Sequence, residues 1–398
     1  VPLPVGTYTT LGLDLWAGGE SIWSYSNTVT NTISRKTLKL MPVVNMGESV
    51  GGEIEGGIVN LSENGTANSY IVSAAGTYKF TPTKGNSSES VGSIASAVVL
   101  WETFGTAVTP NVGDLVKNVK YENGVISFET PSAYKEGNAV IAAKDASGKI
   151  LWSWHIWLTD QPEGQVYYNN AGTVMDRNLG ATSATPGDVG ALGLLYQWGR
   201  KDPFLGSSSI SSNITARSTL AWPSAVSSDS NNGTIEYVTA NPTTFITSRD
   251  GGNSDWYYTG SYTTDNTRWT ESSGPKSIYD PCPAGWRVPD GSENGVWSRA
   301  TGTSSHLYPT FDDTRRGFDF SGLFGADKNI WYPSSGYLHI YSGHVSYVDN
   351  GAFYWSASPG RSDAWWASCL YFYYPTPLIS PAHNQQRAYG CAVRCIQE

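Results

Sequence analysis

The chain has little charge for its length. Only 15% of its 398 residues are charged, and the formal net charge is −9. A nucleic-acid-binding protein needs a basic surface to neutralise phosphates, so this excess of acid argues against such a partner. Long hydrophobic runs are missing too: the most apolar stretch, residues 94–101, has the length of a buried strand. We therefore expect no nucleic-acid partner and no transmembrane segment.

Recognisable catalytic motifs are also absent. The sequence has no G-x-S-x-G turn, no phosphate-binding loop, no G-x-G-x-x-G and no H-E-x-x-H. Its five histidines are scattered, and its four cysteines contain no Cys-x-x-Cys pair at the spacing of a zinc site. We therefore expect no metal, no cofactor and no enzymatic activity.

Aromatic and small residues are abundant instead, with 16 Trp, 24 Tyr and 43 Gly. Low charge with many aromatic residues is typical of β-rich extracellular modules. The chain begins at Val1 without a charged and apolar leader, so we interpret it as the mature or trimmed form of an exported protein. Its length exceeds what one hydrophobic core usually serves, which predicts two or three domains.

The first half of the chain predicts β structure. Residues 1–58 contain only weak strand signals and are expected to form an N-terminal β segment or partial subdomain. Residues 59–163 contain about seven short strands, including a hairpin at Asn123-Gly124 and a strand at residues 150–158 with one fully apolar face. This spacing predicts an immunoglobulin-like β-sandwich.

The second half shows a mixed pattern. A Pro- and Gly-containing linker at residues 161–164 precedes it, and we expect proteases to cut there and release a stable fragment. Short helices are expected to begin at Asp188 and at residues 290–293, with strands near residues 331, 353–358, 364–374 and 388–397. Residues 206–275, rich in Ser, Thr, Asn and Gly, form a long insertion of the kind that often carries binding function.

Several segments of this half resemble a known family. They are residues 174–182 (VMDRNLGAT), 195–204 (LYQWGRKDPF), 280–289 (DPCPAGWRVP), 354–358 (YWSAS) and 387–396 (RAYGCAVRCI). Together they resemble the major paralogous surface domain of Bacteroidetes and Fibrobacter, which is similar in turn to the fold shared by C-type lectins and formylglycine-generating enzymes. The resemblance spans roughly residues 165–398 and implies an α+β, C-type-lectin-like domain at 164–398.

The resemblance implies an exported, non-catalytic surface adhesin, with similar architectures at fimbrial tips. Its partner would be a glycan or a host or bacterial surface protein, and the N-terminal region would join fimbrial subunits by strand donation. Calcium-dependent lectins carry motifs that the C-terminal half of this chain lacks, so no metal is expected. Two alternatives stay open. One is a secreted carbohydrate-active or formylglycine-type enzyme, to which Cys391 and Cys395 point; the other is a structural surface-layer component.

An aromatic-rich segment lies where lectin-like domains carry their ligand loops. Tyrosine and tryptophan rings stack on sugars and anchor protein partners at small entropic cost. The candidate ligand-binding residues are Trp331, Tyr332, Tyr337, Tyr341 and Tyr347.

The cysteines are expected to form two disulfides, as in other exported domains. The resemblance implies a pair between Cys282 and Cys395. Cys369 and Cys391 are then left for each other, on strands expected to be neighbours across a turn at residues 375–384. Because Cys391 and Cys395 lie close in sequence, exchanged partners are the alternative.

Overall fold

The computed structural model describes residues 57–248, 254–260, 265–360, 365–374 and 378–398, together with the backbone of four strands near the N-terminus. The chain is strand-rich and forms two compact units, Val1–Glu53 and Ile54–Glu398. Among the described residues, no helix is long and apolar enough to cross a membrane.

The first unit contains two antiparallel strand pairs. They are β1 (Gly6–Tyr8) with β4 (Asn31–Ile33), and β2 (Leu11–Ala17) with β3 (Glu20–Asn27). The weak alternation at residues 37–42 and the Gly-rich linker at residues 51–56 lie outside the described residues.

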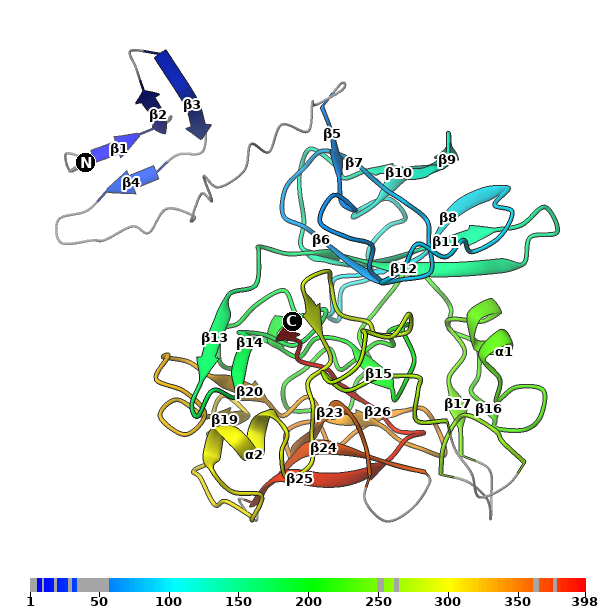
Figure 1. The fold of residues 1–398 in the computed structure, drawn as a ribbon, viewed down its shortest axis with the longest axis vertical. Helices are drawn as coiled ribbons and strands as arrows, with labels where there is room; N and C mark the ends of the chain where they lie inside the picture. The colour runs from blue at the N-terminus through cyan, green and yellow to red at the C-terminus, as the bar shows by residue number, and fades with distance from the viewer. Residues whose placement is uncertain are drawn as a thin grey trace. The chain divides into compact units, whose positions relative to one another are not determined.

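Residues 58–158 form a β-sandwich of two four-stranded sheets (Figure 1). Each sheet contains one parallel strand pair, β5 with β7 and β6 with β12. The first sheet runs β5 (Ile58–Asn60), β7 (Thr77–Phe80), β10 (Val125–Glu129), β9 (Lys117–Glu122). The second runs β6 (Ser69–Val72), β12 (Ile150–Leu158), β11 (Gly137–Lys144), β8 (Ser96–Thr103).

Local sequence signals explain this sandwich well. Asn123 and Gly124 have φ values of 51° and 81°, the left-handed backbone that a tight two-residue hairpin requires. Along β12, Trp152, Trp154 and Ile156 point into the core between the sheets, as their alternation predicts. The opposite face of β12 is buried as well, against the C-terminal half of the chain.

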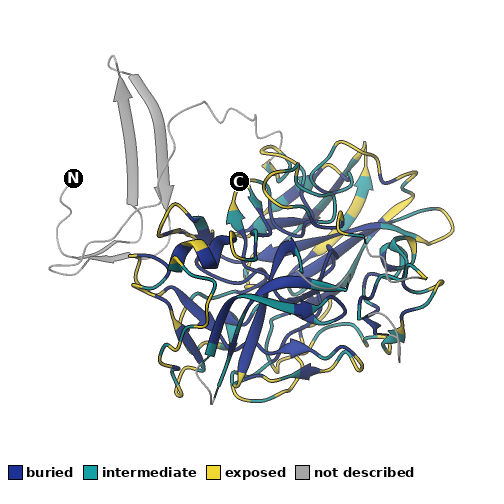
Figure 2. Ribbon diagram, turned by 60° about the horizontal axis from the view of Figure 1, so that its bottom comes forward, coloured by how far each residue is buried: buried dark blue, intermediate teal, exposed yellow. Residues whose placement is uncertain are grey.

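A seven-stranded sheet forms the centre of the C-terminal half. Its order is β22 (Val345–Ser346), β21 (Tyr337–Leu338), β26 (Gly390–Ala392), β23 (Gly351–Pro359), β24 (Trp366–Tyr373), β25 (Leu378–Gln386), with β15 (Leu195–Gln197) also paired to β26. Both faces are covered: Tyr354 and Phe372 lie in one apolar cluster, whereas Trp355 and Cys369 lie in the other. Figure 2 shows buried strands at the centre of this unit and exposed residues mainly in its loops.

Smaller elements surround this sheet. A four-stranded sheet has the order β13 (Gly164–Tyr167), β14 (Gly172–Met175), β27 (Ile396–Gln397), β18 (Trp286–Arg287). Two further strand pairs are β16 (Val226–Ser227) with β17 (Ile246–Thr247), and β19 (Gly317–Asp319) with β20 (Trp331–Pro333).

The helices are short. Asp188 caps only a 3-10 turn, Val189–Ala191, and the residues after it enter β15 instead of continuing a helix. The second expected helix is α2 (Val296–Thr301), which starts later than expected, after Gly295. Helix α1 (Ile235–Ala240), capped by Thr234, lies inside the insertion and was not expected.

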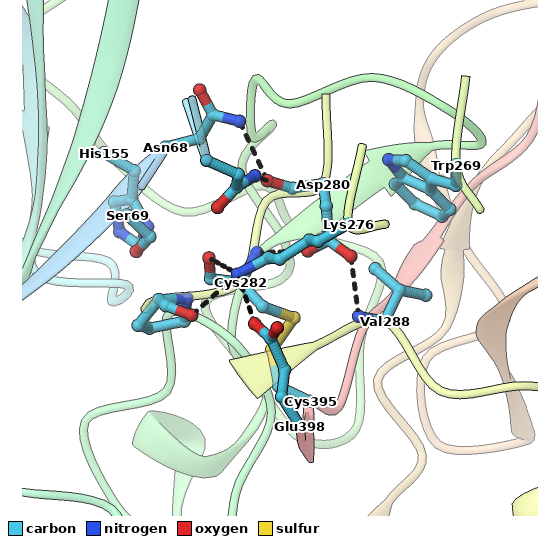
Figure 3. Close-up of a disulfide and its surroundings, with 12 residues drawn as sticks. Asn68, Ser69, His155, Trp269, Lys276, Asp280, Cys282, Val288, Cys395 and Glu398 are labelled. Carbon is cyan, nitrogen blue, oxygen red and sulfur yellow. Dashed lines mark hydrogen bonds and ion pairs between the residues drawn. A yellow bond between two sulfur atoms is a disulfide. The ribbon is translucent and has the colours of Figure 1, made fainter. Parts of the chain in front are cut away.

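The predicted disulfide between Cys282 and Cys395 is confirmed, and it closes a loop with a sequence separation of 113. Figure 3 shows the bond beside the half-buried Lys276, whose ammonium donates to the carbonyls of Cys282 and Pro283 at 3.1 and 2.9 Å. The same ammonium lies 3.4 Å from the carboxylate of Glu398. The disulfide and this ion pair together fix the C-terminal end of the chain.

The second predicted disulfide is wrong: Cys369 and Cys391 are free and buried. Cys369 lies on β24 and Cys391 on β26, and β23 runs between these strands. Two strand spacings correspond to about 9.6 Å, beyond the roughly 7 Å limit for the Cα atoms of a disulfide. The expected turn at residues 375–384 is also wrong, because β25 occupies most of that segment and pairs with β24.

The sandwich and the C-terminal half meet in one shared hydrophobic cluster. Trp101 and Trp157 of the sandwich belong to the same cluster as Trp198 and Trp355. The Trp157 indole donates to the Ala181 carbonyl at 2.9 Å. No compact-unit boundary falls at residues 161–164, so the two halves pack as one unit.

Candidate functional site

A continuous group of aromatic side chains covers part of the seven-stranded sheet. We call it the aromatic face. Neighbouring rings lie between 4.6 and 6.3 Å apart, measured between centroids, and the exposed fraction reaches 58% for Tyr341 and 47% for Tyr347. Its members are Tyr337, His339, Tyr341, Tyr347, Phe353, Tyr371, Tyr373, His383 and Tyr389.

Strand alternation builds this face from distant parts of the sequence. Phe353 on β23 stands beside Tyr371 on β24, with ring centroids 4.6 Å apart. Tyr337 on β21 lies 5.3 Å from Phe353 and stacks on Tyr347 at 5.2 Å. Because strands β21, β23 and β24 belong to one hydrogen-bonded sheet, the rings of Tyr337, Phe353 and Tyr371 are held in fixed positions before any ligand arrives.

Tyr347 has an unusual backbone. Its φ is 60°, the left-handed region that bulky side chains rarely occupy. Such a conformation costs on the order of 1–3 kcal/mol and persists where the surrounding structure enforces it, commonly at binding sites. It holds the Tyr347 ring against Tyr337 while leaving almost half of the side chain exposed.

Burial shifts the pKa values of three members of this face. It raises the pKa of Tyr371 to about 12 and the pKa of Tyr389 to about 12. Burial, together with the nearby His306, lowers the pKa of His383 to about 4. These shifts move the ionisation of all three groups further from neutral pH, so each of the three stays uncharged there.

A cavity of about 330 Å³ is lined by Leu338, which packs on the opposite face of the sheet from its neighbour Tyr337 in the aromatic face. The loop at residues 339–344 contributes to both: His339 and Tyr341 belong to the aromatic face, while Ser342, Gly343 and His344 line the cavity. The remaining lining comes mainly from the 206–275 insertion and comprises Phe204, Leu205, Thr215, Trp222, Pro223, Ser224, Ala225, Thr243, Phe245 and Leu338.

Three aromatic rings line this cavity. Phe204 lies 5.3 Å from Phe245 and 6.0 Å from Trp222, measured between ring centroids. Trp222 in turn packs against Trp101 of the sandwich at 5.5 Å. The sandwich therefore supports one wall of a cavity that the C-terminal half otherwise forms.

The structure separates the five predicted ligand residues into two groups. Tyr341 and Tyr347 are exposed on the aromatic face, and their role in binding stays a prediction. Tyr337 belongs to the same face but is only 8% exposed, so it supports Tyr347 and is not a free surface anchor.

The prediction that Trp331 and Tyr332 contact a ligand at the surface is wrong, because their side chains are only 1% and 0% exposed. Both lie on β20, a strand whose residues are all buried by other segments of the protein. The Tyr332 hydroxyl lies 2.8 Å from the Tyr167 hydroxyl and accepts a hydrogen bond from the Trp297 indole at 3.1 Å. Arg394 packs over the Tyr332 ring at 3.8 Å. Tyr332 is thus a hydrogen-bonded part of the core.

Phe204, Trp222 and Phe245 were not singled out from the sequence. The insertion that carries Trp222 and Phe245 was identified as a binding segment, and large aromatics within its Ser- and Thr-rich sequence were the available signal. Phe204 closes a segment that was assigned only to the family resemblance.

The formylglycine-type alternative rested on Cys391 and Cys395 acting as a pair. Cys395 is bonded to Cys282, and burial raises the pKa of the Cys391 thiol well above its usual value. In the described part of the chain, no three His, Cys, Asp or Glu side chains gather in a way that would hold a metal ion.

Comparisons with protein families, with curated protein sequences and with solved structures find no significant match to this chain. The resemblance to the major paralogous domain is therefore carried by the quoted motifs alone.

Proposed function

We propose that this chain is an exported, non-catalytic adhesin that binds a glycan or a surface protein through its C-terminal half. The single observation that carries the proposal is the aromatic face, with Tyr341 and Tyr347 exposed in the turns that flank β22 beside the sheet. Exposed tyrosines on a fixed support contribute strongly to recognition, because little side-chain entropy is lost on binding.

The architecture proposed for this function is an immunoglobulin-like sandwich that supports a C-type-lectin-like domain. The sandwich and the seven-stranded sheet provide the framework, and the hydrophobic cluster they share holds the binding half in a fixed orientation to the sandwich. Attachment to fimbrial subunits is assigned to the N-terminal unit. The Cys282–Cys395 disulfide fits an oxidising, extracellular location.

The test applies the full chain to a glycan array and to a panel of extracellular proteins. Each ligand that binds is then incubated with the chain and analysed by mass spectrometry. Binding without any change in ligand mass supports the adhesin. A cleaved or modified ligand would contradict the adhesin proposal and support the alternative of a secreted enzyme. Failure to bind any ligand on either panel would favour a structural surface component.

A further inference from the structure

The cavity lined by Phe204, Trp222 and Phe245 has almost no titratable side chain in its lining. Its thirteen lining residues include no Asp, Glu, Lys or Arg, and His344 is the one titratable residue among them. Moving a charged group out of water without a partner is costly, so such a lining disfavours ionic ligands. The volume of about 330 Å³ lies within the range of roughly 300–1,000 Å³ that is usual for small-molecule sites.

Hydroxyl groups are available around this lining. Thr215, Ser224 and Thr243 line the cavity, where Thr243 is half-buried and the other two are exposed, and no protein hydrogen bond occupies their hydroxyls among the described residues. Each hydroxyl is able to donate one hydrogen bond and accept others. In contrast, the Trp222 indole already donates to the Ser218 hydroxyl at 2.9 Å, so Trp222 contributes its ring and not its N–H group.

Aromatic surface and free hydroxyls therefore meet in one cavity without Asp, Glu, Lys or Arg in its lining. Trp222 is partly exposed and is fixed from behind by Phe204 and Trp101. A sugar ring has an apolar face of C–H groups, which stacks on aromatic rings, and an edge of hydroxyls, which pairs with protein hydroxyls. An aliphatic or aromatic ligand would make no hydrogen bond to the half-buried Thr243 hydroxyl, whereas a sugar hydroxyl would.

We propose that this cavity binds one uncharged sugar residue, a neutral hexose or N-acetylhexosamine, at the end of a longer glycan. Trp222 stacks on the sugar ring, and Thr243 and Ser224 hydrogen-bond to its hydroxyls. The inference rests on the proposed binding function and assigns its ligand class.

The experiment titrates the full chain with methyl glycosides of neutral hexoses and N-acetylhexosamines, followed by saturation-transfer NMR and calorimetry. At least one glycoside is expected to bind.

Thr243→Val removes one hydroxyl at nearly constant shape, so affinity should fall roughly three- to tenfold. Trp222→Ala should abolish detectable binding. Because Trp222 also packs on the sandwich, Thr243→Val decides the outcome if the Trp222 variant unfolds. Thr185→Val is the matched control, an exposed threonine outside the cavity that should leave affinity unchanged.

Further ligands separate this inference from its rivals. Sialic acid and methyl glucuronide should bind more weakly than neutral glycosides, and N-acetyltyrosinamide should not compete. The inference is overturned if no neutral glycoside binds, if the charged sugars bind more tightly, or if Thr243→Val and Thr185→Val behave alike. If glycan binding is lost only in Tyr341→Ala and Tyr347→Ala, the adhesin proposal stands and the cavity assignment fails. If nothing on the arrays binds, the adhesin proposal fails as well.

Discussion

The buried His155 shows how one side chain makes stability depend on pH. Its Nδ1 lies 2.9 Å from the Ser69 hydroxyl and its Nε2 lies 2.8 Å from the Asn138 side-chain oxygen. Burial lowers the pKa of His155 from 6.5 to about 3. The unfolded chain therefore takes up a proton near pH 6.5, whereas the folded chain does not until about pH 3. The stabilising effect is complete above pH 6.5 and is lost as the pH falls from there towards 3.

We therefore predict a pH-dependent difference between the wild type and His155→Gln. Each pH unit below 6.5 lowers the free energy of unfolding of the wild type by up to about 1.4 kcal/mol through this group. Between neutral pH and about pH 5 the wild type should lose roughly 2 kcal/mol more than the variant. Urea denaturation at the two pH values measures this. Equal losses in both proteins would show that His155 is not held neutral by the fold.

Residue exposure was the least predictable part of the candidate site. Tyr341 and Trp331 lie in the same aromatic-rich segment, yet one is 58% exposed and the other 1%. Long-range contacts distinguish them. The hydroxyl of Tyr332, the residue after Trp331, is hydrogen-bonded to Tyr167 and Trp297, which come from distant segments of the sequence. Local sequence carries no information on which distant segments cover a short strand, so a surface role for Trp331 looked equally reasonable.

Among the elements, those specified locally were predictable. The Asn123-Gly124 hairpin and the alternating strand β12 follow from turn chemistry and period-two patterning. Strand β25 was missed because it contains Pro381 and several polar residues. Cys369 pairs with His383 and Tyr371 with Ser380, so Pro381 falls at a bulge. Proline has no backbone N–H to donate to a neighbouring strand, and at a bulge of an edge strand no such hydrogen bond is required.

The loop at residues 339–344 offers a test of how an element shapes the cavity. Gly343 has φ of +67°, and a Cβ atom there would lie 2.9 Å from the Phe245 ring. Gly343→Ala should cost about 1 kcal/mol or more in stability through the left-handed backbone, and it should also displace Phe245 and weaken glycoside binding. Gly322→Ala is the matched control, with φ of +76° and nothing within 4 Å of the added Cβ. Calorimetric titration should show weaker binding only for Gly343→Ala; equal affinities would remove Phe245 from the site.

At the scale of the whole molecule, the shared hydrophobic cluster changes what is expected of the linker. Trp101 and Trp157 pack with residues of the C-terminal half, and Arg177 pairs with Asp160 beside the linker. Breaking these contacts would expose apolar surface on both halves. We predict that residues 54–398 unfold in one cooperative transition, detected alike by calorimetry and by tryptophan fluorescence. Two separate transitions, or a stable fragment beginning near residue 165 after limited proteolysis, would show that the halves fold independently.

The central claim is that the aromatic face makes this chain a binding protein. The most direct test compares two double variants for affinity towards a ligand found on the arrays. Tyr341→Ala with Tyr347→Ala should weaken binding by about 2 kcal/mol, roughly thirtyfold, without lowering the midpoint of unfolding. Tyr168→Ala with Tyr308→Ala removes two rings that are 40% and 68% exposed outside the aromatic face, and should bind as the wild type does. Equal affinities of the two double variants would contradict the claim.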